Sequence, residues 1–510
     1  MDKSETNKID INTRQAESQE ASKAGGDPKD IPEPANFAQP KKEDNYPYHD
    51  YSGGEEVEEF VYKPKVGFVF KKLVKPLIAL AVIVLIITPL VFLVLKFSPK
   101  VQKPSVKKGE IVWWGIGLKK EVVEPLIEEY QNANPKVSIT YEEESPIDYR
   151  ERLANSLAQG KGPDIFRFHN SWVPMFKNNL DFLPKDVISQ DEYYKSYYPV
   201  IVRDLTTASG IVGMPLEYDA LTLFINDDIF AAAGKIPPRT WDEFHQLAVD
   251  LTVRGQQGLI IQSGSSLGIT GNVDYWPEIV ALLMLQNKVN LFRPSGSSAE
   301  EAISFYADFG TFAKVWDGTL PTSTEAFADG KVAMFFAPIR AVDSIKAINK
   351  NIKFKTVLLP QVRRDDPTEP EVTYATYWVE GVWNKSPNKD LAWDFLKFLS
   401  KKESLEKLYK NSIASGLSGE PYPRVDMRDI LINDSTLGSV LALAPNAKSG
   451  CLASKTNDGN QGLNSLLNAI YKTGIDGLVA TRNRKGVKAV IDTIAAESAK
   501  VYAKFGVSSQ

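Results

Sequence analysis

The chain has 510 residues, a formal net charge of −4 and 43% hydrophobic residues, so it is long enough for more than one folded domain. Beyond residue 75 the 48 basic and 49 acidic side chains nearly balance, which argues against a strong nucleic-acid-binding surface. One cysteine excludes a disulfide within the chain. Three histidines without an HExxH or paired-cysteine motif argue against a metal site, so we expect no cofactor.

Residues 1–70 are predicted to form a disordered acidic tail. They carry nine Lys/Arg against fifteen Asp/Glu and few aliphatic residues. Such a segment buries too little apolar surface to offset the entropy lost on ordering.

Residues 77–95 contain no charged side chain and predict a transmembrane helix within 73–97. At roughly 1.5 Å per residue they reach about 28 Å, close to the roughly 30 Å of a bilayer core. A buried core helix is the alternative, but a globular domain rarely covers a helix that is apolar all round. Five lysines flank the span on each side, so charge does not orient it, and residues 98–108 form a linker.

The first part of the remaining chain alternates predicted strands and amphipathic helices. Strands are expected at 110–115, 137–143 and 164–168, with helices between them. This order predicts a parallel sheet, whose ligands bind beyond the carboxyl ends of the strands. The candidate side chains at those ends are Trp114, Phe168, Asn170 and Trp172.

A second unit is expected from about residue 219. Strands are predicted at 223–227 and 332–336, and capping boxes at Thr240–Glu243 and Ser298–Glu301 open two helices. The segments 357–360 and 376–383 are predicted as strands that return to the first sheet. The remainder, to residue 510, is mainly helical.

Five segments, in this order and at these spacings, resemble the family 1 extracellular solute-binding proteins of ABC transporters. They are GKGPDIFRFHN, MPLEYDALTLFINDDIF, PPRTWDEFHQLA, TEAFADGKVAMFFAP and SPNKDLAWDFLKFLSKKESLEKL, and the resemblance covers roughly residues 109–510.

The resemblance implies an α/β fold of two lobes joined by a multi-stranded hinge, with a solute held between them. We expect lobe 1 to comprise 109–218 and 358–400, and lobe 2 to comprise 219–357 and 401–510. It also implies that the carboxyl-terminal domain is extracellular and the acidic tail cytoplasmic. The expected partners are a small solute, the permease subunits and ATPase of an ABC importer, and the membrane through one helix.

A saccharide site needs aromatic faces for the C–H surfaces of the sugar and fixed polar groups for its hydroxyls. The resemblance places an acidic ligand-binding residue at the first hinge crossing, where Asp219 matches best, beside Glu217. It further points to Trp276, Arg340, Trp378 and Glu380. Glu217 and Asp219 point the same way on an extended strand, so one can bind ligand while the other pairs with an arginine.

Two other functions stay open from the sequence. A tethered glycosidase needs two carboxylates on opposite sides of a glycosidic bond, and Asp219 with Glu380 is the one pair that suits it. A sensory receptor would use the same binding domain with the acidic tail as its output. We favour a binding protein without enzymatic activity.

Overall fold

The computed structural model describes residues 81, 83–88, 107–364, 366 and 368–507. The chain divides into two units, residues 1–101 and 102–510. In the first unit the described residues are helical and exposed, and the predicted tail and most of the predicted span lie outside the described residues. No helix within the described ranges is both long and apolar enough to cross a membrane.

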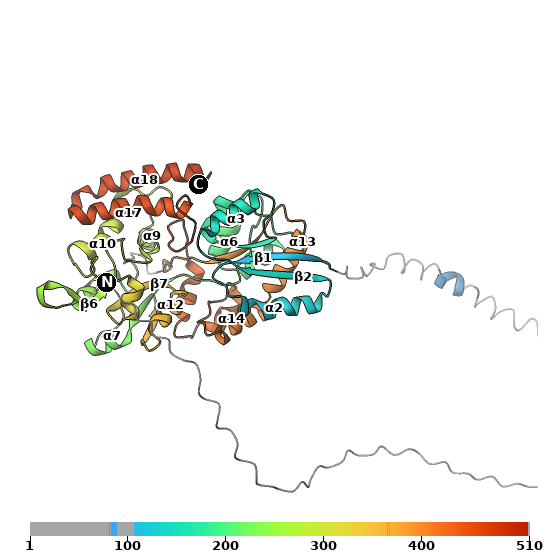
Figure 1. The fold of residues 1–510 in the computed structure, drawn as a ribbon, viewed down its shortest axis with the longest axis horizontal. Helices are drawn as coiled ribbons and strands as arrows, with labels where there is room; N and C mark the ends of the chain where they lie inside the picture. Colours follow the sequence, from blue (N-terminus) through green and yellow to red (C-terminus); the bar gives the residue numbers. More distant parts are fainter. Residues whose placement is uncertain (1–80, 82, 89–106, 365, 367, 508–510) are drawn as a thin grey trace, which may run out of the picture. The chain divides into compact units, whose positions relative to one another are not determined.

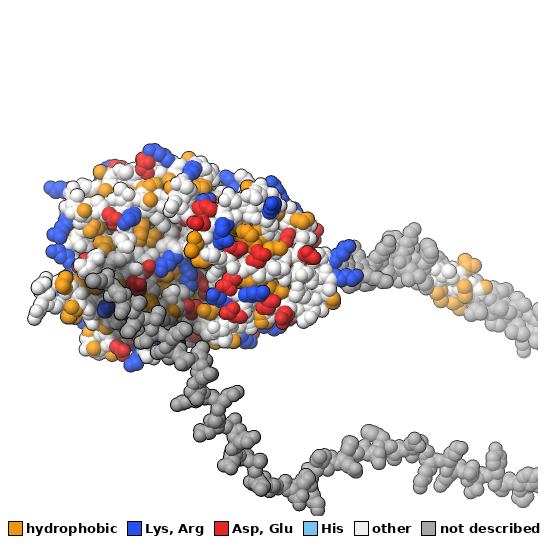
Figure 2. Space-filling model, viewed as in Figure 1, with side chains coloured by type: hydrophobic (Ala, Val, Ile, Leu, Met, Phe, Trp, Pro, Cys, Tyr) orange, Lys and Arg blue, Asp and Glu red, His pale blue; other side chains and the backbone are white. Residues whose placement is uncertain are grey.

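The second unit contains two hydrophobic cores, each built on its own sheet, and we call these bodies lobe 1 and lobe 2. Figure 1 shows lobe 1 around β1 and β2 and lobe 2 around β6 and β7. The two-lobe α/β architecture expected from the sequence is confirmed. Acidic and basic side chains are interspersed on the surface seen in Figure 2, in keeping with the near-neutral composition.

Lobe 1 has a four-stranded sheet in the order β2-β1-β3-β9. Its strands are β1 (Gly109–Gly115), β2 (Val137–Glu143), β3 (Ile165–His169) and β9 (Trp378–Val382). The first three are parallel, as predicted, and β9 returns antiparallel to β3. The helices that contribute buried side chains to its core are α2 (Lys120–Ala133), α3 (Tyr149–Ala158), α4 (Val173–Phe176), α5 (Gln190–Ser196), α6 (Pro199–Leu205), α13 (Lys389–Leu399), α14 (Lys402–Ala414) and α16 (Gly438–Leu443), with α15 (Arg428–Leu431) alongside.

Lobe 2 has a five-stranded sheet in the order β5-β6-β7-β4-β8. Its strands are β4 (Leu221–Asn226), β5 (Val253–Arg254), β6 (Ile260–Ser265), β7 (Val332–Pro338) and β8 (Phe354–Val357). The main helices are α7 (Asp227–Ala233), α8 (Trp241–Asp250), α9 (Trp276–Gln286), α10 (Gly296–Thr311), α11 (Ser323–Ala328), α12 (Ala341–Ile348), α17 (Leu463–Thr481) and α18 (Val487–Lys504). Every residue of β4 and β7 is buried, which explains their largely apolar sequences.

The lobe boundaries differ from those predicted. The strand that follows α12, β8, pairs with β4 in lobe 2 rather than returning to the first sheet. The chain therefore crosses to lobe 1 near Ala375 instead of at residue 358. The helices of 402–443 pack mainly in lobe 1, although residues 401–510 were assigned to lobe 2. An amphipathic pattern shows that a helix has a buried face but not which core covers it.

The two predicted capping boxes had different outcomes. Thr240 accepts from the backbone of Glu243 and the Glu243 carboxylate accepts in return, so the first box is confirmed. The box at Ser298 is wrong because α10 begins earlier, at Gly296, and places Ser298 inside the helix. A box that was not predicted opens α11, between Thr322 and Glu325.

Three chain segments cross between the lobes side by side and form the hinge ribbon, residues 219–221, 373–376 and 448. Leu221 N donates to Tyr374 O at 2.8 Å, and Thr376 N donates to Asp219 O at 3.0 Å. Ala375 N donates to Lys448 O at 2.8 Å, which adds the third segment. These backbone bonds join the three segments through isolated β-bridges.

Candidate ligand-binding site at the hinge

The polar centre of lobe 1 is an arginine held between two glutamates, the arginine cluster. Arg167, on β3, is 2% exposed; its Nη2 donates to Glu217 at 2.6 Å and its Nη1 donates to Glu380 at 3.3 Å. Glu380 lies opposite Arg167 in the β3–β9 register and also accepts from Trp113 Nε1 at 2.9 Å. Burial raises the pKa of Glu380 to about 7, and the Arg167 charge limits that rise.

Asp219 lies in the hinge ribbon with no exposed surface. One of its oxygens accepts from the backbone of Ala220 and Ile339 at 2.8 and 2.7 Å. The other accepts from the backbone and Nη1 of Arg340 at 3.1 and 3.2 Å. Burial raises the pKa of Asp219 to about 6, and Arg340 and the backbone donors keep it from rising further. With its acceptors used inside the protein, Asp219 positions the Arg340 guanidinium, whose Nη1 also donates to Thr376 O at 2.9 Å.

Three aromatic side chains of lobe 1 pack together near these charges. Trp378, at the start of β9, is 9% exposed and meets the edge of His169 at 5.4 Å and of Trp172 at 5.7 Å between ring centres. His169 bonds Ser171 and Thr376 through its two ring nitrogens, and burial together with Arg340 lowers its pKa well below the usual value. A neutral His169 therefore links the Trp378 ring to the hinge.

Lobe 2 contributes residues around the start of α9. Trp276 is nearly buried, and the preceding Tyr275 ring lies 4.7 Å from Lys455 Nζ, which pairs with Asp274 at 3.1 Å. Burial raises the pKa of Tyr275, while the charges of Lys455 and Arg340 limit the rise. Tyr275 and Lys455 were not predicted from the sequence, although Tyr275 adjoins the aromatic signal at Trp276.

The loop after α14 adds a carboxylate that sequence reasoning missed. Pro421 O accepts from Tyr218 N at 2.8 Å, which sets Glu420 beside the segment that carries Glu217 and Asp219. Burial and these two carboxylates raise the pKa of Glu420 well above its usual value. No sequence motif marks Glu420, because only the fold brings it to the hinge.

The other predicted residues lie around this group in different ways. Trp114 is partly buried against the lobe 1 core, and Asn170 is buried, donating to Asp204 at 3.0 Å. Phe168 and Trp172 expose no surface, so the expectation that they contact ligand directly is revised. The β3 pleat places Phe168 on the side away from Arg167 and beside Phe166, and Trp172 stacks on Tyr149 and Phe176 behind Trp378.

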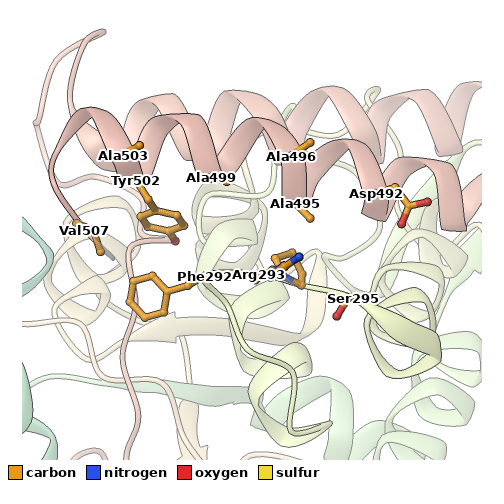
Figure 3. A pocket seen from close by; sticks show the side chains of 11 residues that line it. Phe292, Arg293, Ser295, Asp492, Ala495, Ala496, Ala499, Tyr502, Ala503 and Val507 are labelled. Atoms are coloured by element: carbon orange, nitrogen blue, oxygen red, sulfur yellow. The ribbon is translucent and has the colours of Figure 1, made fainter. Parts of the chain in front are cut away.

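Two of the cavities among the described residues lie in lobe 2 and beside the hinge ribbon. One, of about 620 Å³, lies within lobe 2 between the loop at Phe292 and Arg293 and the alanine-rich face of α18 (Figure 3), and none of the predicted residues lines it. The other, of about 470 Å³, adjoins the hinge ribbon and is lined by both lobes, including Asn170 and Lys448. Among the described residues, no group of three His, Cys, Asp or Glu side chains is placed to hold a metal ion.

Comparisons with known proteins agree with the two-lobe fold. The family model described as bacterial extracellular solute-binding protein matches residues 125–418. A Brucella abortus protein named as a binding protein is 24% identical over 336 residues, covering 64% of this chain and 79% of its own. The maltotriose-binding protein of Pyrococcus abyssi is 22% identical over 315 residues, covering 59% and 64%.

A solved structure shares the fold. An ABC transporter solute-binding protein from Thermotoga lettingae, bound to alpha-D-tagatose, aligns with a TM-score of 0.60 at 19% identity. The alignment covers 78% of this chain and 100% of that one.

Proposed function

Because the chain belongs to the bacterial extracellular solute-binding protein family, we propose that it captures an uncharged, hydroxyl-rich solute, a mono- or oligosaccharide, between its two lobes. The observation that supports this most is the combination of paired charges and aromatic rings at the hinge. Trp378 in lobe 1 and Trp276 in lobe 2 supply aromatic surface, and the groups around Arg167 and Arg340 supply fixed donors and acceptors.

The charge balance favours an uncharged ligand over an anionic one. Arg167 already pairs with Glu217 and Glu380, and Arg340 pairs with Asp219. A phosphate or carboxylate ligand would have to compete with these buried carboxylates for the guanidinium groups. Hydroxyls can instead donate to Glu217, of which only Oε2 accepts from Arg167, and can approach the arginines without separating the pairs.

We further propose that residues 77–95 tether the protein to the membrane and that it delivers its solute to the permease of an ABC importer. The tether is supported by the uncharged apolar length of that stretch, and the importer by the family and by the transporter named for the Thermotoga lettingae relative. Protease treatment of intact cells should remove the carboxyl-terminal domain while leaving the acidic tail protected. Protection of the domain would contradict the orientation.

The glycosidase alternative is weaker. Asp219 accepts four hydrogen bonds and exposes no surface, and Glu380 is bound to Arg167 and Trp113. Neither carboxyl is free to protonate a leaving group or to attack a sugar.

A thermal-shift screen of the full chain in detergent tests the proposed function. The library should contain maltotriose, mannobiose and tagatose, with amino acids and inorganic phosphate as comparison ligands. A saccharide at 100 times its dissociation constant should add about 2.7 kcal/mol to the free energy of unfolding. Stabilisation by the amino acids or phosphate alone, or release of shorter sugars during incubation, would overturn the proposal.

The Arg340→Met variant tests the site. It should weaken saccharide binding at least tenfold, because it removes the guanidinium that donates to Asp219 and Thr376 at the hinge. The matched control is Arg254→Met, which removes an exposed arginine of β5 and should bind as the wild type does. Equal affinity in both variants would count against the hinge site.

A further inference from the structure

The loop of residues 415–421 belongs to lobe 1 but contacts lobe 2. Leu417 packs against the lobe 1 core, and Ser418 N donates to Asp343 Oδ1 at 2.7 Å. Lys346 Nζ also donates to Ser418 Oγ at 3.4 Å. Asp343 and Lys346 both lie on α12 of lobe 2, so this loop joins the lobes outside the hinge ribbon.

Two glycines give the loop its path. Gly416 and Gly419 have φ angles of +79° and +70°, which other residues adopt only with strain. At Gly419 a Cβ atom would also lie 2.6 Å from the Tyr409 ring. The chain therefore turns sharply after Ser418 and brings Glu420 to the hinge, where the bond from Tyr218 N to Pro421 O holds it.

Glu420 differs from the other carboxylates at the hinge. Glu217, Asp219 and Glu380 each accept hydrogen bonds or ion pairs from side chains or backbone, as given above. Glu420 accepts none from any residue that the structure describes. Burial, Glu217 and Asp219 disfavour its charged form, while Arg167 and Arg340 favour it, so hydrogen-bond donors brought by a bound molecule would further stabilise the carboxylate.

Taking the proposed function as its basis, we propose that Glu420 is a specificity-determining contact that accepts hydrogen bonds from two adjacent hydroxyls of the solute. The contact between Ser418 and Asp343 couples this binding to closure of the lobes. The two oxygens of a carboxylate can accept from both hydroxyls of a vicinal diol, and a solute lacking one of them leaves an acceptor unpaired. The same loop carries Glu420 and, through Ser418, contacts α12. Binding of the solute to Glu420 therefore favours the contact between Ser418 and Asp343, and that contact favours binding.

Calorimetry on the full chain in detergent tests the contact, using whichever of maltotriose, mannobiose and tagatose binds the wild type most tightly. Glu420→Gln should weaken binding at least tenfold. The control Glu142→Gln, which changes an exposed carboxylate of β2, should leave the affinity unchanged. Without sugar, the melting temperature of Glu420→Gln should equal or exceed that of the wild type, because no hydrogen bond among the described residues is lost and the burial and repulsion that disfavour the charged form are relieved. A structural role would instead lower it.

Asp343→Ala tests the coupling. It should weaken binding about threefold to tenfold, and the double variant with Glu420→Gln should bind no more weakly than Glu420→Gln alone. Independent effects that multiply would overturn the coupling, and wild-type affinity in Glu420→Gln would overturn the contact. If no saccharide binds the wild-type protein, the proposed function fails and this inference fails with it.

Discussion

The two lobes bury their central strands in different ways. In lobe 2, β4 and β7 are buried along their whole length by apolar and aromatic side chains, with Phe224, Phe327 and Phe335 in mutual contact. In lobe 1, the neighbouring strands β3 and β9 carry Arg167 and Glu380, which pair beside the hinge.

This difference means that the two lobes are stabilised by different kinds of interaction. Apolar packing stabilises lobe 2 without specifying where a polar ligand binds, because the hydrophobic effect is not directional. The bonds of Arg167 are directional and hold Glu217 toward the hinge. This fits the proposed site, in which lobe 1 and the hinge ribbon supply the fixed polar groups and lobe 2 contributes Trp276 and Lys455.

The largest effect is expected from a substitution that breaks the arginine cluster of lobe 1. Arg167→Met should lower the free energy of unfolding by about 3–5 kcal/mol, because it leaves two carboxylates without their cation. Denaturant unfolding followed by fluorescence measures this loss. Met334→Leu, at a fully buried site on β7 in lobe 2, is the control and should cost less than about 1.5 kcal/mol, because the two side chains have similar volumes. Equal losses would remove the distinction between the lobes.

The second effect concerns pH. The folded-state pKa of Glu380 is about 7, raised from 4.5, so the protonated form is favoured in the folded protein. The stabilisation is fully present below pH 4.5 and is lost as the pH rises to about 7. Relative to Glu380→Gln, which does not titrate, the wild type should lose about 3 kcal/mol across this window. Unfolding measured at pH 4.5, 6 and 8 checks it, and parallel pH profiles would contradict it.

Removing a helix cap should lower the free energy of unfolding by a similar amount in the two lobes. Thr240 caps α8 in lobe 2, and Ser189 caps α5 in lobe 1 through a hydrogen bond from Glu192 N. Thr240→Ala and Ser189→Ala should each cost about 1 kcal/mol, since the lost bond is local to the first turn. A loss more than twice as large in either lobe would show that the cap also supports tertiary packing.

The smallest effect is expected at an exposed pair. Lys488 and Asp492 on α18 are 2.7 Å apart, a separation close to that of Arg167 and Glu217. Both side chains are solvated, so Lys488→Met should leave the denaturation midpoint within experimental error. A clear shift of the denaturation midpoint would mean that burial does not explain why the arginine cluster of lobe 1 contributes more to stability than an exposed pair.

Local sequence signals predicted much of the fold. The alternating patterns located β1, β2 and β3 within a residue or two, and the turn chemistry at Thr240 located the start of α8. The predicted motif residues also include several that meet at the hinge, among them Glu217, Asp219 and Arg340. The signal at Ser298 misled, because a polar pair inside a helix resembles one at its start.

The sequence by itself determined the strands, most helix faces and the family, because these depend on periodicity and on segments that are contiguous in the chain. Only the tertiary structure decided which core covers the helices of 402–443, that Phe168 and Trp172 are fully buried, and that Glu420 lies beside Glu217. Those outcomes depend on contacts between residues far apart in the chain, and no local pattern encodes which of several apolar or charged partners a side chain will meet.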